Sequence, residues 1–350
     1  MEKIFSVYKK KIDARIIELS QEIKNLNLAW SKEVSKQLAE SAIKGKTVRG
    51  SLVLMTADLF NKPITTAEIT IAASLEYLHT ALLVHDDIMD NDDMRRGLPS
   101  AHKQYEKIGK DLKALKADEL GQDLAICAGD IAIFAANWFI AQTKNIKSEI
   151  RLQILALAGE EYCRVGLGQM QDITFAKTPK LPQIDEVLAM YTNKTARYTF
   201  SLPLMIGGLL AEQKKETLKV LDKIGLSLGL IFQLTDDALT LHGQSQEVGK
   251  AIGNDISENK KTLYHILLRQ KANTQDNKTL DTIFGKKTVG AYEINQVKKL
   301  LITYQVETEI NNLIKTYVKQ AQQAINQLPL EPSRQDGLSA LINHLLVRTK

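Results

Sequence analysis

One short stretch of the chain concentrates aspartate: LHTALLVHDDIMDNDDMRRG, residues 78–97. Asp86 and Asp90 are four positions apart, so on a helix they point in directions only about 40° apart. Like charges at this spacing repel one another and weaken an isolated helix, which indicates that cations neutralise them. Oxygen-only ligand sets suit hard cations, chiefly Mg²⁺ or Ca²⁺. The adjacent Arg95 and Arg96 offer forked donors that fit phosphate oxygens.

A second polar stripe interrupts the apolar segment IFQLTDDALTLHG, residues 231–243. Its members lie three and four positions apart, on one face of a helix: Gln233, Asp236, Asp237 and Thr240. Such a stripe must line a cavity or pair with other groups, because an unpaired buried carboxylate is very costly. Either acidic cluster alone also fits a solvated helix end or a salt-bridge network. Together with two arginines they indicate that carboxylates bind Mg²⁺ and that Mg²⁺ binds a diphosphate.

Basic residues at several other places could contact the same anion. Lys46 and Arg49 lie three positions apart just after Gly45, and we expect them on one helical face. The other candidates are Lys194, Lys250 and Lys260. The P-loop, HExxH, GxSxG and CxxC patterns are absent, so the sequence gives no support for a P-loop nucleotide site, a metalloprotease, a serine hydrolase or a zinc site.

Helices are predicted to position these side chains. The proline-free intervals 1–62, 100–178 and 204–328 show apolar residues at helical spacing, and alternation with a period of two is nearly absent. Segments 131–140 and 224–234 are apolar on all sides, as expected inside a large bundle. The predicted loops are 109–122, 177–183, 242–261 and 272–289.

The composition is that of a soluble globular protein, with 350 residues, 44% of them hydrophobic and 25% charged. Length alone favours two domains of about 150 residues each. No predicted loop is distinctive enough to be a linker, so we predict a single all-α domain over residues 1–350.

Other features bear on compartment and partners. The apolar stretch 131–141 is shorter than the roughly 18 residues that span a bilayer, and the N-terminus lacks the apolar core of a signal peptide. The chain has 2 cysteines, which is no disulfide framework, so a cytoplasmic location is expected. The scattered basic residues behind a net charge of +5 give no support for binding of nucleic acid.

These motifs, in this order, resemble the trans-isoprenyl diphosphate synthase (polyprenyl synthetase) family. GKTVRG is similar to the family's GKxxR box, and HDDIMDNDDMRRG to its first aspartate-rich motif. GQMQDI resembles its GQxxD segment, NKTA its KT pair, and FQLTDDALT its second aspartate-rich motif. GKAIGNDISENKKTL resembles the lysine loop that follows, and the similarity covers roughly residues 40–265.

The resemblance implies an isoprenoid synthase fold, which is an all-α bundle around a deep central cavity, usually in a homodimer. It also implies a prenyltransferase of isoprenoid biosynthesis with three Mg²⁺ ions per active site. Such an enzyme condenses isopentenyl diphosphate with an allylic diphosphate to make a longer trans-polyprenyl diphosphate. The Mg²⁺, Lys and Arg charges stabilise the departing diphosphate, and that diphosphate is a plausible base for the proton that is lost.

The resemblance also assigns roles to residues. The implied metal ligands are Asp86, Asp87, Asp90, Asp236, Asp237 and Asp172. Gln169 and Asp172 would support the metal cluster or the developing cation. The allylic diphosphate would be held by Arg95, Lys194, Gln233, Lys250 and Lys260. Isopentenyl diphosphate would be held by Lys46, Arg49, His79 and Arg96. Oxygen dipoles for the allylic cation would come from Thr195 and Gln233.

Product length can be argued from positions one turn below the first motif. Leu82 lies about 6 Å below Asp86 along the helix, and the small Ala81 lies beside Leu82. Bulky aromatic residues at these two positions would form a floor that stops the growing chain early. Because Ala81 is small and Leu82 is of moderate size, a C20 product is expected, with C15 and longer products as alternatives. A different possibility is that both residues only pack in the core.

Two departures from the family pattern leave alternatives open. Thr240 replaces the last carboxylate of the second motif, and GKTVRG lacks the second arginine and the proline of the commoner GKRxRP. The first departure raises the possibility of a non-catalytic subunit of a heteromeric synthase. A terpene cyclase would not need the second diphosphate site that Lys46, Arg49 and His79 imply. A cation-binding structural protein would leave the lysine motifs unexplained.

Overall fold

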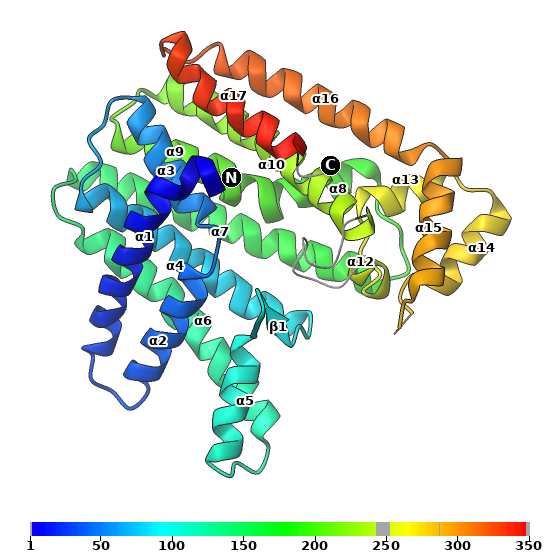
Figure 1. The fold of residues 1–350 in the computed structure, drawn as a ribbon, viewed down its shortest axis with the longest axis horizontal. Helices are drawn as coiled ribbons and strands as arrows, with labels where there is room; N and C mark the ends of the chain where they lie inside the picture. Colours follow the sequence, from blue (N-terminus) through cyan, green and yellow to red (C-terminus); the bar gives the residue numbers. More distant parts are fainter. Residues whose placement is uncertain (1, 243–252, 287, 348–350) are drawn as a thin grey trace. The chain divides into compact units, whose positions relative to one another are not determined.

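A computed structural model describes residues 2–242, 253–286 and 288–347 of the chain, and helices dominate it (Figure 1). Within these described residues the only sheet is a two-stranded hairpin. The predicted all-α fold class is therefore confirmed. The chain divides into two compact units, Met1–Ala156 with Ile206–Gln213, and Leu157–Met205 with Lys214–Lys350. The single domain over residues 1–350 stays a prediction.

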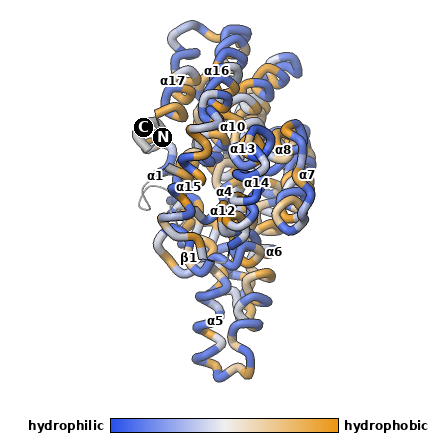
Figure 2. Tube along the Cα trace, turned by 90° about the vertical axis from the view of Figure 1, so that its right-hand side faces the viewer, coloured by the Kyte–Doolittle hydropathy of each residue, from blue (hydrophilic) through white to orange (hydrophobic). Residues whose placement is uncertain are grey.

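The first unit contains the helices that carry the first aspartate-rich motif and the lysine box. Its elements are α1 (Glu2–Lys24), α2 (Ser31–Ile43), α3 (Val48–Leu59), α4 (Thr66–Met89), β1 (Met94–Arg95), β2 (Leu98–Pro99), α5 (Ala101–Asp111) and α6 (Ala117–Gln142). Helix α4 packs against α1, α3 and α6. The α5 segment is mostly hydrophilic (Figure 2). Helix α4 is apolar along most of its length.

The second unit carries the remaining motifs. Helix α7 (Ser148–Lys177) begins in the first unit and ends in the second. The elements that follow are α8 (Ile184–Tyr191), the π-helix η1 (Thr192–Ser201), α9 (Leu202–Leu210), α10 (Lys215–His242), α12 (Asn254–Ser257), α13 (Leu263–Lys271), α14 (Thr274–Ile283), α15 (Ala291–Thr303), α16 (Val306–Ile325) and α17 (Pro332–Val347). Of these, α9 begins in the second unit and ends in the first. Helix α10 packs against η1, α16 and α17.

A capping box fixes the start of α4. The Thr65 hydroxyl accepts a hydrogen bond from the Ala67 backbone N–H at 3.2 Å, and the Glu68 carboxylate accepts one from the Thr65 N–H at 2.9 Å. These bonds satisfy donors that a helix start leaves open. From there α4 runs without interruption to Met89, so its last turn presents Asp86 and Asp87.

The hairpin after α4 turns on Arg96 and Gly97. Both have positive φ values, 52° and 75°, and strand pairing joins Arg95 to Leu98. Positive φ at both central residues is typical of the tight two-residue hairpin turn, and glycine adopts it without steric cost. The turn was not predicted, although Arg-Gly between short extended segments is a weak signal for it. It places the two arginines at different positions of one turn.

The π-helix η1 lies against α10 at a distance that only glycine allows. A Cβ atom on Gly225 would collide with the Ser201 backbone, and one on Gly229 would collide with the Ala196 backbone. These glycines are four positions apart on α10, so they line one face of that helix. The π-helix itself was not predicted, and such segments often occur at functional sites.

The predicted loops have mixed outcomes. Residues 178–183 between α7 and α8 are a loop, as predicted. The loop predicted over 109–122 is shorter, because α5 extends to Asp111 and α6 begins at Ala117. The loop predicted over 272–289 was wrong, since it contains α14 with an Asn273 cap that accepts from the Asp276 N–H. In the segment predicted over 242–261, the residues 243–252 lie outside the described part.

Three helices, α4, α6 and α10, are long and apolar enough to cross a membrane, judged by length and composition only. The expectation of no membrane span was based on uncharged runs, whereas these helices include isolated charged residues. Within the most apolar window of each helix, 78% of α4 is buried but only 44% of α6. Helix α6 is thus the one whose apolar surface is least covered.

The contact between η1 and α10 predicts a difference between two alanine substitutions. Gly225→Ala forces a methyl group into the Ser201 backbone and is expected to lower the free energy of unfolding by about 1–3 kcal/mol. Gly159→Ala in α7 meets no atom within 4 Å and is expected to raise it by about 0.5–1 kcal/mol. Urea unfolding followed by circular dichroism measures both, and equal effects would contradict the close approach.

Candidate active site

The first aspartate cluster lies at the C-terminal end of α4. Asp90 is the residue that ends the helix, and its backbone N–H donates to the Asp86 carbonyl at 2.8 Å. The Asp86 side chain is 25% exposed, whereas that of Asp87 is 4% exposed. Adjacent positions on a helix point about 100° apart, which explains this difference. Asp86 and Asp90 thus share an accessible side, and Asp87 points inward.

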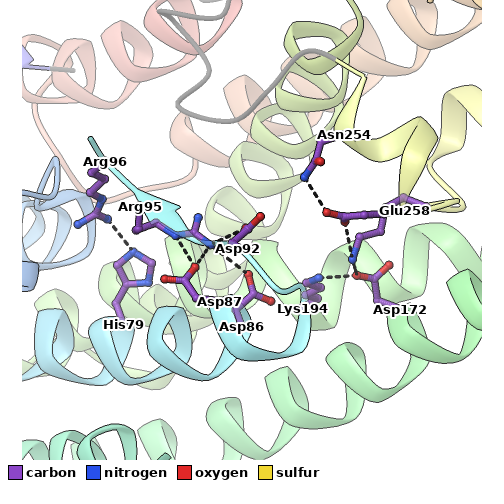
Figure 3. A network of polar contacts seen from close by, with 11 residues as sticks. His79, Asp86, Asp87, Asp92, Arg95, Arg96, Asp172, Lys194, Asn254 and Glu258 are labelled. Carbon is purple, nitrogen blue, oxygen red and sulfur yellow. Dashed lines mark hydrogen bonds and ion pairs between the residues drawn. The ribbon is translucent and has the colours of Figure 1, made fainter. Parts of the chain in front are cut away.

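Arg95 returns from the hairpin to this cluster (Figure 3). Its Nε donates to the Asp87 carboxylate at 2.6 Å, and its Nη2 lies 3.2 Å from Asp92 and 3.9 Å from Asp86. Burial raises the pKa of Asp87 to about 6, although the hydrogen bond from Arg95 lowers it. One guanidinium therefore offsets the repulsion among Asp86, Asp87 and Asp92.

Arg96 leaves the same turn toward the lysine box (Figure 3). Its Nη1 donates to the Ser41 carbonyl at 3.2 Å, and its Nη2 lies 3.4 Å from His79 Nε2. Burial lowers the pKa of His79 well below its usual value, and the nearby Arg49 and Arg96 charges lower it further. His79 is therefore neutral, so its Nε2 accepts from Arg96. Two residues predicted to bind isopentenyl diphosphate thus lie together.

The prediction that Lys46 and Arg49 share one helical face was wrong. Helix α3 begins at Val48, so Lys46 belongs to the preceding loop, and Thr47 between them has a left-handed backbone with φ of 51°. Lys46 is exposed, whereas Arg49 is only 7% exposed. Sequence spacing could not foresee this reversal of the backbone, because threonine is rarely found in that conformation.

A buried carboxylate beneath this loop was missed by the sequence reasoning. Glu76 is 3% exposed and accepts a hydrogen bond from the Gly50 N–H at 2.8 Å. Burial raises the pKa of Glu76, and the charges of Arg49 and Arg96 lower it. The available signal was a lone glutamate in an apolar helix, three positions before His79. Such a group needs partners, and here it anchors the start of α3.

In the second unit, two lysines converge on Asp172 (Figure 3). The Lys194 ammonium donates to the Asp172 carboxylate, and Lys260 Nζ lies 3.3 Å from the same oxygen. Asp172 is 5% exposed; burial raises its pKa, but the two lysine charges lower it below its usual value overall. Glu258 lies 3.5 Å from Lys260. The structure thus unites the GQxxD segment, the KT pair and the lysine loop.

Asp237 of the second motif is held by uncharged donors. Its carboxylate accepts from the Tyr191 hydroxyl and, at 2.8 Å, from Gln233 Nε2. Tyr191 also accepts from the Leu263 N–H at 2.8 Å, so it joins three segments. Burial and the charge of Asp255 raise the pKa of Asp237 well above its usual value. Asp236 is less buried and points about 100° away on the same helix.

Thr240 has a definite role in the fold. Its hydroxyl lies 2.7 Å from the Asp255 carboxylate, and the Gly253 N–H donates to the Thr240 carbonyl at 3.3 Å. These bonds fasten α12 to the end of α10. A carboxylate from a later segment therefore lies beside the position where the second motif lacks one. Lys250, which precedes Gly253, lies outside the described residues.

The remaining predicted residues are placed as follows. Gln169 and Thr195 are partly exposed on α7 and η1, and Leu82 is partly exposed on α4. Ala81 is fully buried. The predicted roles of these four residues stay predictions.

The donor chemistry of the first motif fits a hard cation. Asp86 and Asp90 provide oxygen ligands at an accessible helix end, and Mg²⁺ prefers oxygen ligands. Over the described ranges, no group of three His, Cys, Asp or Glu side chains is already arranged to hold an ion. Mg²⁺ sites commonly use one or two carboxylates together with phosphate oxygens and water, so the substrate would supply the rest.

Comparisons with known proteins agree with these motifs. The family model described as polyprenyl synthetase matches residues 29–301. A geranylgeranyl diphosphate synthase of Sulfolobus acidocaldarius is 30% identical over 285 residues, which are 81% of each protein. A short chain isoprenyl diphosphate synthase of Methanocaldococcus jannaschii is 33% identical over 258 residues, which are 73% of this chain and 72% of the relative.

A solved structure has the same fold. It is geranylgeranyl pyrophosphate synthase from Corynebacterium glutamicum in complex with isoprenyl diphosphate and magnesium, with a TM-score of 0.88, 22% identity and coverage of 99% of both chains. From the family match over most of the sequence and the relatives that are at least 30% identical, it follows that the chain belongs to the polyprenyl synthetase family of trans-prenyl diphosphate synthases.

Proposed function

We propose that this protein condenses isopentenyl diphosphate with an allylic diphosphate, releases pyrophosphate, and forms a C20 trans-prenyl diphosphate. The observation that carries this proposal is the arrangement of cationic side chains beside family aspartates. Arg95 contacts Asp86 and Asp87, and two lysines contact Asp172. Each of these cations could turn to a diphosphate that arrives with Mg²⁺. The geranylgeranyl diphosphate synthase among the relatives supports the C20 product.

Two sets of residues would bind the two substrates. The allylic diphosphate would be held with Mg²⁺ by the acidic helices and by Arg95, Lys194 and Lys260. Isopentenyl diphosphate would be held by the group at the lysine box, Lys46, Arg49, His79 and Arg96. Burial and the nearby arginine charges keep His79 neutral, and its ring lies 3.4 Å from Arg96 within this group.

Magnesium would be held by Asp86 and Asp90 of the first motif and by Asp236 of the second, and we propose three ions. Bound Mg²⁺ would offset the negative charge that develops on the leaving diphosphate. Asp237 is better suited to orienting Gln233 than to binding metal, because both of its oxygens accept hydrogen bonds from side chains. Asp172 would keep Lys194 and Lys260 aligned for the diphosphate.

The protein would then guide ionisation and coupling through its own groups. Lys194, Lys260 and Arg95 stabilise charge on the departing diphosphate. Gln233 donates its amide N–H to Asp237, so its carbonyl oxygen is the group left to stabilise the allylic cation, together with the Thr195 hydroxyl. The double bond of isopentenyl diphosphate attacks the cation, and the released diphosphate accepts the proton.

Substitution of the two lead aspartates tests this proposal. Asp86→Asn and Asp236→Asn are each expected to lower kcat/KM at least about 100-fold, because charge stabilisation in the transition state is lost. Product formation is measured by mass spectrometry, and Mn²⁺ binding by electron paramagnetic resonance provides a second readout.

The matched control is Asp93→Asn. Its side chain is 71% exposed in the same segment, and it pairs with Lys103 on the surface. We expect it to retain activity within about twofold, as surface ion pairs contribute little. Full activity of Asp86→Asn or of Asp236→Asn would contradict the proposed function.

Product length gives a second prediction. Ala81→Phe adds bulk one turn below the first motif and is expected to shorten the main product from C20 to C15 or less. Leu82→Ala removes bulk beside it and is expected to lengthen the product. Both are measured by mass analysis after incubation with each allylic starter. An unchanged product from both variants would show that other helices form the floor.

A non-catalytic subunit is the second candidate function, and Thr240 is the observation behind it. Its bond to Asp255 supports catalysis instead, because a carboxylate is retained beside the altered motif position. Turnover by the purified protein alone, with both substrates and Mg²⁺, decides between them.

We also propose a cytoplasmic homodimer in which a second copy covers the exposed face of α6. Phe134 is 73% exposed on this face, with Ile126 at 44% and Trp138 at 38%. Apolar surface of this kind marks an interface with a protein or with a membrane. The Asp130 side chain, 54% exposed on the same face, favours the protein interface over the lipid.

A substitution on the exposed face of α6 tests the proposed dimer. Phe134→Glu is expected to convert the dimer to a monomer in sedimentation velocity, because a charge would be buried without a partner. The control Leu115→Glu changes a fully exposed residue before α6 and is expected to leave the dimer intact. A monomeric wild type, or wild type that floats with lipid vesicles, would contradict the proposal.

A further inference from the structure

The N-terminal helix α1 contributes a contact to the lysine-box loop. The family match begins at residue 29, so α1 lies before it. The loop of residues 44–47 connects α2 to α3 and carries Lys46, and Arg49 follows in the first turn of α3. Lys9 of α1 reaches both ends of this loop.

The Lys9 ammonium has three kinds of acceptor. It lies 2.9 Å from the Asp13 carboxylate, and it donates to the Ile43 carbonyl at 2.7 Å and to the Thr47 hydroxyl at 3.1 Å. An ammonium has three N–H donors, so these contacts use all of them. Ile43 is the last residue of α2, and a cation at a helix C-terminus is stabilising. Lys9 thus caps α2 and contacts Thr47 at the start of α3.

Thr47 has the conformation that most needs such support. Its backbone is left-handed, with φ of 51° and ψ of 41°, and its side chain is 1% exposed. A β-branched residue is an outlier there, and such strain persists only where the surroundings hold it. The Thr47 hydroxyl accepts from Lys9 and lies 3.4 Å from Asp13, to which it can donate. Two residues of α1, Lys9 and Asp13, therefore hold the left-handed backbone bend at Thr47.

The bend determines where the anion-binding groups lie. Because Thr47 reverses the backbone, exposed Lys46 stays in the loop while Arg49 enters α3 and is buried. On the other side, Arg96 bonds to the Ser41 carbonyl near the end of α2. Loss of the bend would move Lys46 relative to Arg49 and Arg96. Misplacement of such groups by about 1 Å can cost two orders of magnitude.

We propose that Lys9 is a positioning residue that holds the lysine-box loop in the conformation that binds isopentenyl diphosphate. It acts through Thr47 and α2 and does not contact the substrate. This inference rests on the proposed function, because it assigns that diphosphate to Lys46, Arg49 and Arg96. It extends the site to a helix that carries none of the family motifs.

The experiment compares variants of α1 by direct binding and by kinetics. Lys9→Met keeps the length of the side chain but removes its charge. It is expected to raise the Kd of isopentenyl diphosphate, measured by calorimetry with Mg²⁺ and no allylic substrate, about tenfold. KM for isopentenyl diphosphate rises in parallel, whereas kcat and KM for the allylic diphosphate change less than about twofold.

Three further variants make the test specific. Lys9→Arg retains the cation and is expected to remain within about threefold of wild type. Lys10→Met, an exposed neighbour on α1, should bind as wild type does. Thr47→Val removes the hydroxyl, and its effect should not add to that of Lys9→Met, because both act through one contact. If Lys9→Met does not fold, Thr47→Val carries the same expectation.

The outcomes separate the two proposals. If the wild type does not elongate the allylic diphosphate, the proposed function is overturned. The comparison of Kd values would still decide the role of Lys9. An active wild type with an unchanged Kd in Lys9→Met would overturn the inference. So would a loss that affects both substrates equally or that appears in Lys10→Met, since either result would indicate a general effect on folding.

Discussion

Carboxylates that are crowded at helix ends and in buried positions need compensating groups, and this constraint shapes the sites in both units. Arg95 compensates Asp87 at the end of α4, and two lysines compensate Asp172 on α7. Asp237 has only neutral donors, and burial together with the charge of Asp255 raises its pKa well above the usual value. An unpaired buried charge would cost a large part of the roughly 5–15 kcal/mol of net stability that a domain has.

The irregular elements of the fold deliver these compensating groups. The hairpin after α4 brings Arg95 back to the helix that the chain has just left. The π-helix η1 presents Lys194, and glycine at Gly225 and Gly229 lets it approach the backbone of α10. Regular helices provide the rigid frame, while departures from regularity set the direction of the charged side chains. That division is consistent with irregular segments being frequent at functional sites.

Sequence reasoning predicted what depends on periodicity and on motif spacing. The helical fold, the loop at 178–183 and the grouping of Asp86 with Asp90 follow from local patterns. The left-handed Thr47 and the contact of Lys9 with the loop depend on residues far apart in sequence, and no local pattern encodes them. For the buried Glu76 the local pattern showed only a glutamate in an apolar helix, and not its partner at Gly50. Thr47 in particular contradicts its own backbone preference, which tertiary contacts override. Lys46 and Arg49 were misplaced for that reason.

The hairpin turn has one more consequence. Arg95 and Arg96 are consecutive, yet one contacts the aspartate cluster and the other contacts His79. A two-residue turn has almost no slack, since both of its central residues already occupy a restricted backbone region. A rotation of the Arg95 side chain therefore need not move the backbone of its neighbour. The rigid turn gives the two adjacent guanidinium groups separate tasks and keeps the attachment point of each one fixed while the other changes partner.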